Sequence, residues 1–171
     1  DPEGFELLRH GVLQARRAWI PAGRVVNTLP LAALRTALAD NALHLHYQPV
    51  LRVHDRTIVG AEALLRWNDA EHGSISPKVF IALAEESGLI HALGEWVLLR
   101  ACRQAREWRD AGLDVEAIAI NISPRQLKSD AIVAVVRAAL GQSGLEARLL
   151  ELEITESQAV FQDPNCLARL H

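Results

Sequence analysis

The chain has 171 residues, of which 50% are hydrophobic and 23% charged, and this composition is typical of a globular protein and not of a disordered one. The formal net charge is −3 and no basic run stands out, which argues against DNA or RNA polymers as partners. The two cysteines, Cys102 and Cys166, stand in unrelated contexts, so neither a disulfide framework nor a metal finger is indicated.

The chain contains no methionine, even at position 1, and we interpret it as part of a longer polypeptide. The cysteine usage favours a reducing compartment. No apolar stretch in the sequence approaches the length of a membrane span, so we expect no direct membrane insertion by this segment. We therefore expect a cytoplasmic location, with any membrane tether in another part of the polypeptide.

Hydrophobic periodicity and glycine and proline positions predict alternating strands and helices. Residues 1–28 are expected to hold a connector helix from an upstream domain, and residues 29–171 the main fold. In chain order, the elements predicted after the connector are a helix at 31–39, strands at 43–51 and 59–67, a polar loop at 68–76, helices at 77–86 and 90–111, a strand at 115–123, a helical region at 124–140, a strand at 149–157 and a helix from 164.

This alternation predicts an α/β fold with a largely parallel sheet and helices outside it. A complete (β/α)₈ barrel needs about 250 residues. Residues 29–171 would supply about the first half of such a barrel.

The strand predicted at 59–67 is apolar except for two charged side chains. Side chains alternate along a strand, so Glu62, Leu64 and Arg66 share one face. A carboxylate and a guanidinium are costly to bury without partners. A site that holds a cation at Glu62 and a phosphate at Arg66 would supply those partners.

Two later strands repeat this arrangement of one apolar and one polar face. In the strand at 115–123 the polar face ends in Asn121 and Ser123, and in the strand at 149–157 it carries Glu151 and Glu153. Barrel enzymes build their sites from the ends of successive strands, and the pattern predicts such a site here.

Each of these residues also has a purely structural interpretation. Glu62 could be a strand carboxylate, Asn121 could cap the helix opened by Pro124, and one of the two glutamates could be a solvated edge residue. His44 and His46 share a strand face, but no third ligand at metal spacing accompanies them, so we expect a pocket rim or exposed face there.

Residues 62–66 (EALLR) resemble the signature of the EAL domain family, phosphodiesterases that open cyclic di-GMP. Four further stretches match motifs of that family in order and spacing, and they are residues 47–49 (YQP), 80–90 (FIALAEESGLI), 121–127 (NISPRQL) and 151–156 (ELEITE). Five motifs in register are a specific signal, whereas the three letters EAL alone would be a weak one.

The resemblance implies a modified TIM barrel whose first strand is antiparallel to its neighbours. It further implies two divalent cations, Mg²⁺ or Mn²⁺, and hydrolysis of one phosphodiester of cyclic di-GMP to give linear pGpG. Carried over by position, the implied metal ligands are Glu62, Asn121 and Glu153, the substrate-binding residues are Gln48, Leu64 and Arg66, and Glu156, which orders a loop near the metals, joins Glu62 and Glu153 among the catalytic residues.

The chain departs from the family pattern where it stops. The family's next strand carries a paired-aspartate motif, followed by a lysine, a glutamate and a glutamine, and none of them has a counterpart before His171. We therefore assign hydrolysis to the parent protein and expect the isolated chain to be inactive. The alternatives are a cyclic di-GMP receptor without catalysis and an interaction scaffold, and the family resemblance also suggests a homodimer.

Overall fold

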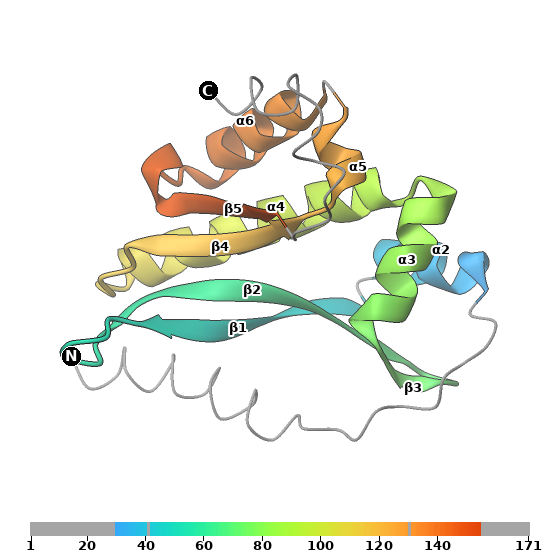
Figure 1. The fold of residues 1–171 in the computed structure, drawn as a ribbon, viewed down its shortest axis with the longest axis horizontal. Coiled ribbons are helices and arrows are strands. Elements are labelled where there is room, and N and C mark those ends of the chain that lie inside the picture. The colour runs from blue at the N-terminus through green and yellow to red at the C-terminus, as the bar shows by residue number, and fades with distance from the viewer. Residues whose placement is uncertain (1–29, 41, 130, 155–171) are drawn as a thin grey trace.

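The computed structural model describes residues 30–40, 42–129 and 131–154, which form one sheet with helices packed against it (Figure 1). The elements are α2 (Leu31–Ala39), β1 (Leu43–Leu51), β2 (Ile58–Asp69), β3 (Gly73–Ile75), α3 (Pro77–Ser87), α4 (Ile90–Asp110), β4 (Ala117–Ile122), α5 (Pro124–Leu127), α6 (Ala131–Ser143), the 3₁₀ turn η1 (Ala147–Leu149) and β5 (Leu150–Ile154).

The strand order is β1-β2-β4-β5, with the short β3 paired to β2. β1 runs antiparallel to β2, whereas β2, β4 and β5 run parallel to one another. Because β2, β4 and β5 run parallel, their carboxyl ends lie at one edge of the sheet (Figure 1). The predicted α/β class and the antiparallel first strand are therefore confirmed.

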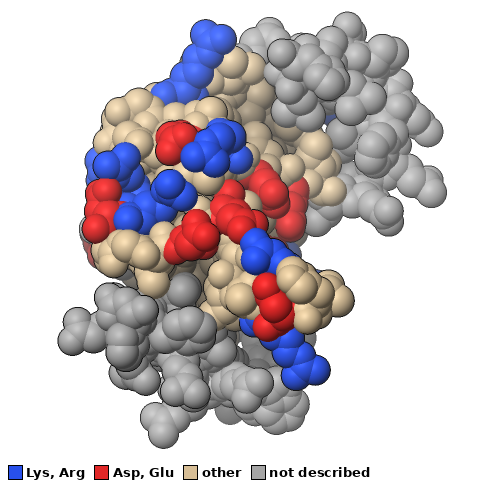
Figure 2. Space-filling model, turned by 90° about the vertical axis from the view of Figure 1, so that its left-hand side faces the viewer, with Lys and Arg blue, Asp and Glu red and all other residues tan. Residues whose placement is uncertain are grey.

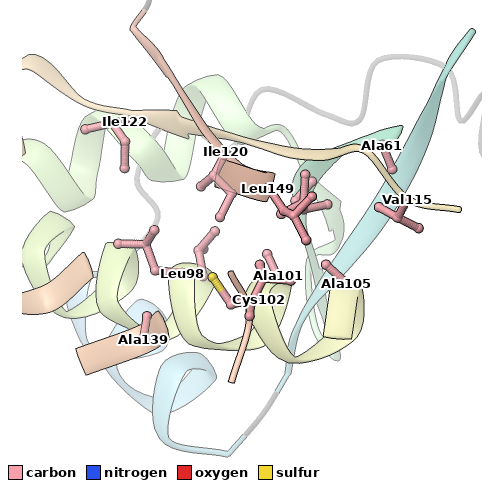
Figure 3. Packing of buried hydrophobic residues seen from close by; sticks show 14 of the residues in the cluster. Ala61, Leu98, Ala101, Cys102, Ala105, Val115, Ile120, Ile122, Ala139 and Leu149 are labelled. Atoms are coloured by element: carbon pink, nitrogen blue, oxygen red, sulfur yellow. The ribbon is translucent and has the colours of Figure 1, made fainter. Parts of the chain in front are cut away.

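The main core lies between the sheet and α4 (Figure 3). Ile118 and Ile120 on β4 are 0% and 1% exposed, and they belong to one buried cluster with Leu98, Ala101 and Cys102 of α4. Burying side chains of this kind contributes about 1.5–3 kcal/mol for each large one. The isoleucine face of β4 thus faces the helices, as the alternation predicted, and the opposite face of the sheet is left for polar groups.

A second cluster secures the far end of β2. Trp67 contacts Phe80 of α3 edge to face, with ring centroids 5.7 Å apart, and Leu34 of α2 is buried with them. This packing fixes β2 just beyond Arg66. The position of the polar residues on β2 is therefore set by a rigid apolar anchor.

The prediction of a polar loop at 68–76 is wrong. β2 continues to Asp69 and pairs with β3, so this segment is a small hairpin. The Asp69 carboxylate accepts hydrogen bonds from the backbone N–H groups of Glu71 and His72, which stabilises the turn. The helical region at 124–140 consists of two helices, α5 and α6. The connector at 1–28 lies outside the described residues.

The end of the molecule where β2, β4 and β5 begin carries both signs of charge (Figure 2). Its ion pairs include Arg52–Glu116, Arg106–Asp110 and Arg148–Glu146. Exposed pairs like these contribute little to stability, but among the described residues their mixture leaves no continuous basic surface at this end. Across the described parts of the chain, no helix is long and apolar enough to cross a membrane.

Candidate functional site

Polar residues gather on the sheet face that the helices leave uncovered. Ala61 and Ala63 of β2 belong to the cluster under α4, so Glu62 between them points to the opposite face. By the same alternation, Asn121 of β4 and Glu153 of β5 point away from the helices. The three residues expected to be metal ligands therefore share one face of three neighbouring strands.

Two of these side chains are in direct contact. The Asn121 amide nitrogen donates a hydrogen bond to the Glu62 carboxylate, with Nδ2 and Oε1 2.7 Å apart. Asn121 and Glu153 are register partners on adjacent parallel strands. The structure thus brings Glu62, Asn121 and Glu153 together, although they are up to 91 positions apart in the sequence.

The charges in this cluster repel one another. The pKa of Glu153 is raised, first by burial, then by the nearby carboxylates of Glu62 and Glu151. Carboxylates that oppose each other's ionisation in this way are stabilised by a cation between them. The site is therefore electrostatically suited to a divalent ion, because an ion would remove the repulsion that the metal-free protein carries.

The donor set also fits a hard cation. Two carboxylates and an amide offer oxygen ligands, which Mg²⁺ and Mn²⁺ prefer, and the Asn121 amide can present its oxygen if it rotates away from Glu62. Within the part of the chain that the structure describes, no group of three or more His, Cys, Asp or Glu side chains could hold a metal ion by itself. The described residues would therefore supply only some of the ligands of such an ion.

Arg66 lies four residues beyond Glu62 on β2, and its side chain is on the same face of the sheet. Its guanidinium donates a hydrogen bond from Nη1 to the carbonyl oxygen of Leu65 at 2.9 Å. Burial lowers the pKa of Arg66, and the charge of Glu62 acts in the opposite direction. No ion pair joins Arg66 to a carboxylate among the described residues. This leaves a partly desolvated cation for which an anionic ligand would be a good partner.

A pocket of about 270 Å³ opens where the parallel strands end. It lies between the sheet and the helices α3 and α4 and is mostly apolar; Arg66 and Asn121 are among its lining residues, whereas Glu62 and Glu153 are not. Gln48 is exposed on β1 and pairs with Glu62 across the antiparallel ladder, which puts it at the edge of the polar face. Glu156 lies outside the described residues.

Asn121 does not cap the helix that follows it. Ser123 is the N-cap of α5, and its hydroxyl accepts a hydrogen bond from the Arg125 backbone N–H at 3.2 Å. The Gln126 side chain in turn accepts from the Ser123 backbone N–H at 3.0 Å, which completes a capping box. The capping interpretation of Asn121 is therefore wrong, and its amide is left for the polar face.

Sequence reasoning missed the support that this cap gives to the site. Ser123 also donates a hydrogen bond to the Glu85 carboxylate, which ties the start of α5 to α3 at the wall of the pocket. The polar residue Gln126 is buried, with 4% of its surface exposed. The spacing of Ser123 and Gln126 is a recognisable capping-box signal, whereas nothing local in the sequence pointed to Glu85.

Comparisons with known proteins bear on the family and the fold. Residues 31–171 match the family model of the EAL domain. The bifunctional diguanylate cyclase/cyclic di-GMP phosphodiesterase MucR of Pseudomonas aeruginosa is 47% identical over 127 residues, which cover 74% of this chain and 18% of MucR. The cyclic di-GMP phosphodiesterase NbdA of the same organism is 44% identical over 128 residues, which cover 75% of this chain and 16% of NbdA.

Solved structures show the same relationship. The MucR phosphodiesterase in complex with c-di-GMP superposes with a TM-score of 0.77 at 45% identity, over 82% of this chain and 57% of that one. The FimX EAL domain of Xanthomonas citri in complex with c-diGMP gives a TM-score of 0.69 at 30% identity, over 81% of this chain and 53% of that one. The chain therefore spans little more than half of these EAL domain structures and under a fifth of MucR and NbdA. With a family match over most of its length and a similar fold in a solved structure at 45% identity, the chain belongs to the EAL domain family.

Proposed function

We propose that this chain supplies the first part of an active site that hydrolyses cyclic di-GMP to linear pGpG, with two divalent cations, Mg²⁺ or Mn²⁺, as cofactors. The observation that carries the proposal is the cluster of Glu62, Asn121 and Glu153 on one sheet face, with Arg66 beyond it. Its relatives named as cyclic di-GMP phosphodiesterases support the reaction class.

Each residue has a role that follows from its chemistry and place. Glu62, Asn121 and Glu153 would hold the cations, which supply charge neutralisation and an acidic water for attack on phosphorus. Arg66 would bind a phosphate of the substrate, and Leu64 and Gln48 would line the surface that the dinucleotide covers. Glu156 would order a loop next to the cluster.

The remaining parts of the proposal concern the whole protein. The described residues form a partial metal site, so the isolated chain would be inactive and the complete domain active. Residues 1–28 would connect this domain to an upstream one, and the domain would work as a homodimer in the cytoplasm. Polymeric DNA or RNA would not be a partner, because the net charge is −3.

A second candidate function is binding without catalysis. The FimX EAL domain, 30% identical, was solved with c-diGMP bound, so the fold can serve as a receptor surface for the same dinucleotide. The two functions share Arg66 and the pocket, and they differ in whether the metal ligands support turnover.

The test uses a complete EAL domain that contains this chain, with Mg²⁺ or Mn²⁺ and cyclic di-GMP, and chromatography to separate substrate from pGpG. We expect turnover by the wild type and a loss of about 100-fold or more in Glu62→Gln, since one metal ligand contributes several kcal/mol to the transition state. Glu86→Gln is the matched control, because Glu86 is exposed on α3, and it should keep wild-type turnover.

Two results would contradict the proposal in different ways. Normal turnover by Glu62→Gln would remove Glu62 from the metal site. Tight binding of cyclic di-GMP by a wild type that makes no pGpG with either metal would favour the receptor function.

A further inference from the structure

Two histidines lie on the same sheet face as the candidate site. In the antiparallel pair of β1 and β2, His44 is directly opposite Arg66 and His46 is directly opposite Leu64. Side chains of directly opposite residues stand on one face about 5 Å apart. Both imidazoles are half-buried, and their ring centroids are 5.1 Å apart. A group of two imidazoles and one guanidinium therefore stands where β1 begins.

This group makes the polar face electrically asymmetric. The potential cations, His44, His46 and Arg66, lie on β1 and at the carboxyl end of β2. The carboxylates of Glu151 and Glu153 lie on β5, at the other side of the sheet, and Glu62 lies between the two groups, on β2. Neighbouring strands are about 4.8 Å apart, so a ligand that spans the face would meet positive groups at one side and acidic groups at the other.

The positive charges of His44, His46 and Arg66 oppose one another. The pKa of His46 is lowered, first by burial, then by His44, then by Arg66. The groups whose charge acts on His46 are His44 on its own strand and Arg66 on β2, and Glu62 stands further along β2, opposite Gln48. Within the described residues, neither His44 nor His46 has an ion pair with a carboxylate.

A metal site does not account for the pair. Two imidazoles need at least one more ligand to hold zinc, and the described residues contain no such cluster of three. A packing role does not account for the two histidines either, because both rings are only half-buried and lie near the positive charge of Arg66. An anion would relieve this crowding, since it is attracted to all three groups at once.

We propose that His44 and His46, together with Arg66, form a phosphate-binding subsite that takes the phosphodiester of cyclic di-GMP that is not cleaved, and that the bound phosphate holds a proton on His46. The inference rests on the proposed function, because it places the cleaved phosphodiester at Glu62, Asn121 and Glu153. It adds two residues of β1 to the site and makes affinity depend on pH. The histidines position the substrate and do not take part in bond breaking.

The first experiment measures cyclic di-GMP binding calorimetrically at pH 6 in EDTA, with a complete EAL domain that contains this chain. Without metal, the readout leaves out the contribution of the cations to binding. We expect His46→Gln and His44→Gln each to weaken binding about ten-fold, because each removes a charge-assisted hydrogen bond. His54→Gln is the matched control, since His54 is exposed at the opposite end of β1, and it should bind as the wild type does.

The second experiment separates this role from a structural one. A phosphate that holds a proton on His46 raises its pKa on binding, so binding takes up a proton and weakens as pH rises. Between the free pKa, which lies below 6.5, and the higher bound pKa, the dissociation constant should rise by up to ten-fold per pH unit. His46→Gln should flatten this profile, and the His46 ring proton resonance should titrate at higher pH with cyclic di-GMP than without it.

The possible failures are distinguishable. If both histidine variants bind as the wild type does and the His46 titration does not move, the subsite is wrong, while hydrolysis by the wild type keeps the proposed function intact. If weaker binding comes with an unchanged pH profile, the histidines act by packing and the subsite is wrong as well. If the wild type neither binds nor hydrolyses cyclic di-GMP, the proposed function and the subsite both fail.

Discussion

At the scale of single residues, the spacing of β2 and β4 depends on a glycine, Gly60, which has no side chain. Gly60 pairs with Ala117 where the two strands begin to run together. A Cβ atom at position 60 would come within 2.4 Å of the Ala117 carbonyl oxygen. This oxygen belongs to the backbone and cannot rotate away, so a larger residue at position 60 would push the strands apart.

We predict that Gly60→Ala lowers the free energy of unfolding by about 1–3 kcal/mol, the usual range for overpacking a rigid site. Urea unfolding followed by circular dichroism measures it. Gly141→Ala is the matched control, because Gly141 lies in α6 with no atom within 4 Å of the added Cβ, and it should gain up to about 1 kcal/mol from helix propensity. Equal stabilities of the two variants would show that β2 and β4 tolerate the wider spacing.

The positions of single site residues could be predicted where a local pattern indicated them. The alternating direction of side chains along a strand put Glu62, Leu64 and Arg66 on one face, and the structure shows them there. The same reasoning reached Asn121 but left its role open, because an asparagine before a helix is also a common cap. Only the observed hydrogen bonds, with Ser123 as the cap, remove that alternative.

At the scale of elements, the short helix α5 is held by a reciprocal cap and joins the end of β4 to the pocket wall. Ser123 and Gln126 each satisfy a backbone N–H group at the start of the helix. Because both bonds need the same local backbone geometry, loss of one weakens the other. The two side chains should therefore act as one unit.

A double-mutant cycle tests this expectation. We predict that Ser123→Ala and Gln126→Ala each cost about 1–2 kcal/mol in the free energy of unfolding, the usual range for a lost cap. The double variant should cost at least about 0.5 kcal/mol less than the sum of the two single changes, as coupled residues do. Urea unfolding of the four proteins gives the coupling energy, and strict additivity would mean that each bond forms independently.

The small hairpin of β2 and β3 shows why some elements escaped prediction. Residues 68–76 are mostly polar and β3 has only three residues, so no alternation of any length marks a strand there. The pairing depends on the turn that the Asp69 side chain stabilises and on Trp67 packing against Phe80. The Asp69 turn is local, but the Trp67–Phe80 contact is tertiary, and a pattern search along the chain cannot detect that contact.

At the scale of the whole molecule, the described residues form an open sheet with helices on one face. β1 and β5 are the two edges of its strand order, and the polar face between them carries the candidate site. In a closed barrel both edges would be paired and the opposite wall would face this site. The functional consequence is that half of a barrel can hold some ligands of a shared ion but cannot surround it.

This geometry leads to a prediction about the chain as it stands. We expect residues 1–171 to release no pGpG from cyclic di-GMP with Mg²⁺ or Mn²⁺, while a complete EAL domain that contains them turns the substrate over, although Glu62, Asn121 and Glu153 are identical in both. The physical reason is that two carboxylates and an amide leave coordination positions open on each ion, and six ligands are usual for Mg²⁺. Chromatography of the products measures this, and circular dichroism of the chain must show helix and strand so that unfolding does not explain inactivity. Measurable turnover by the chain alone would mean that the described face already contains a sufficient metal site, and the assignment of further ligands to the rest of the domain would be wrong.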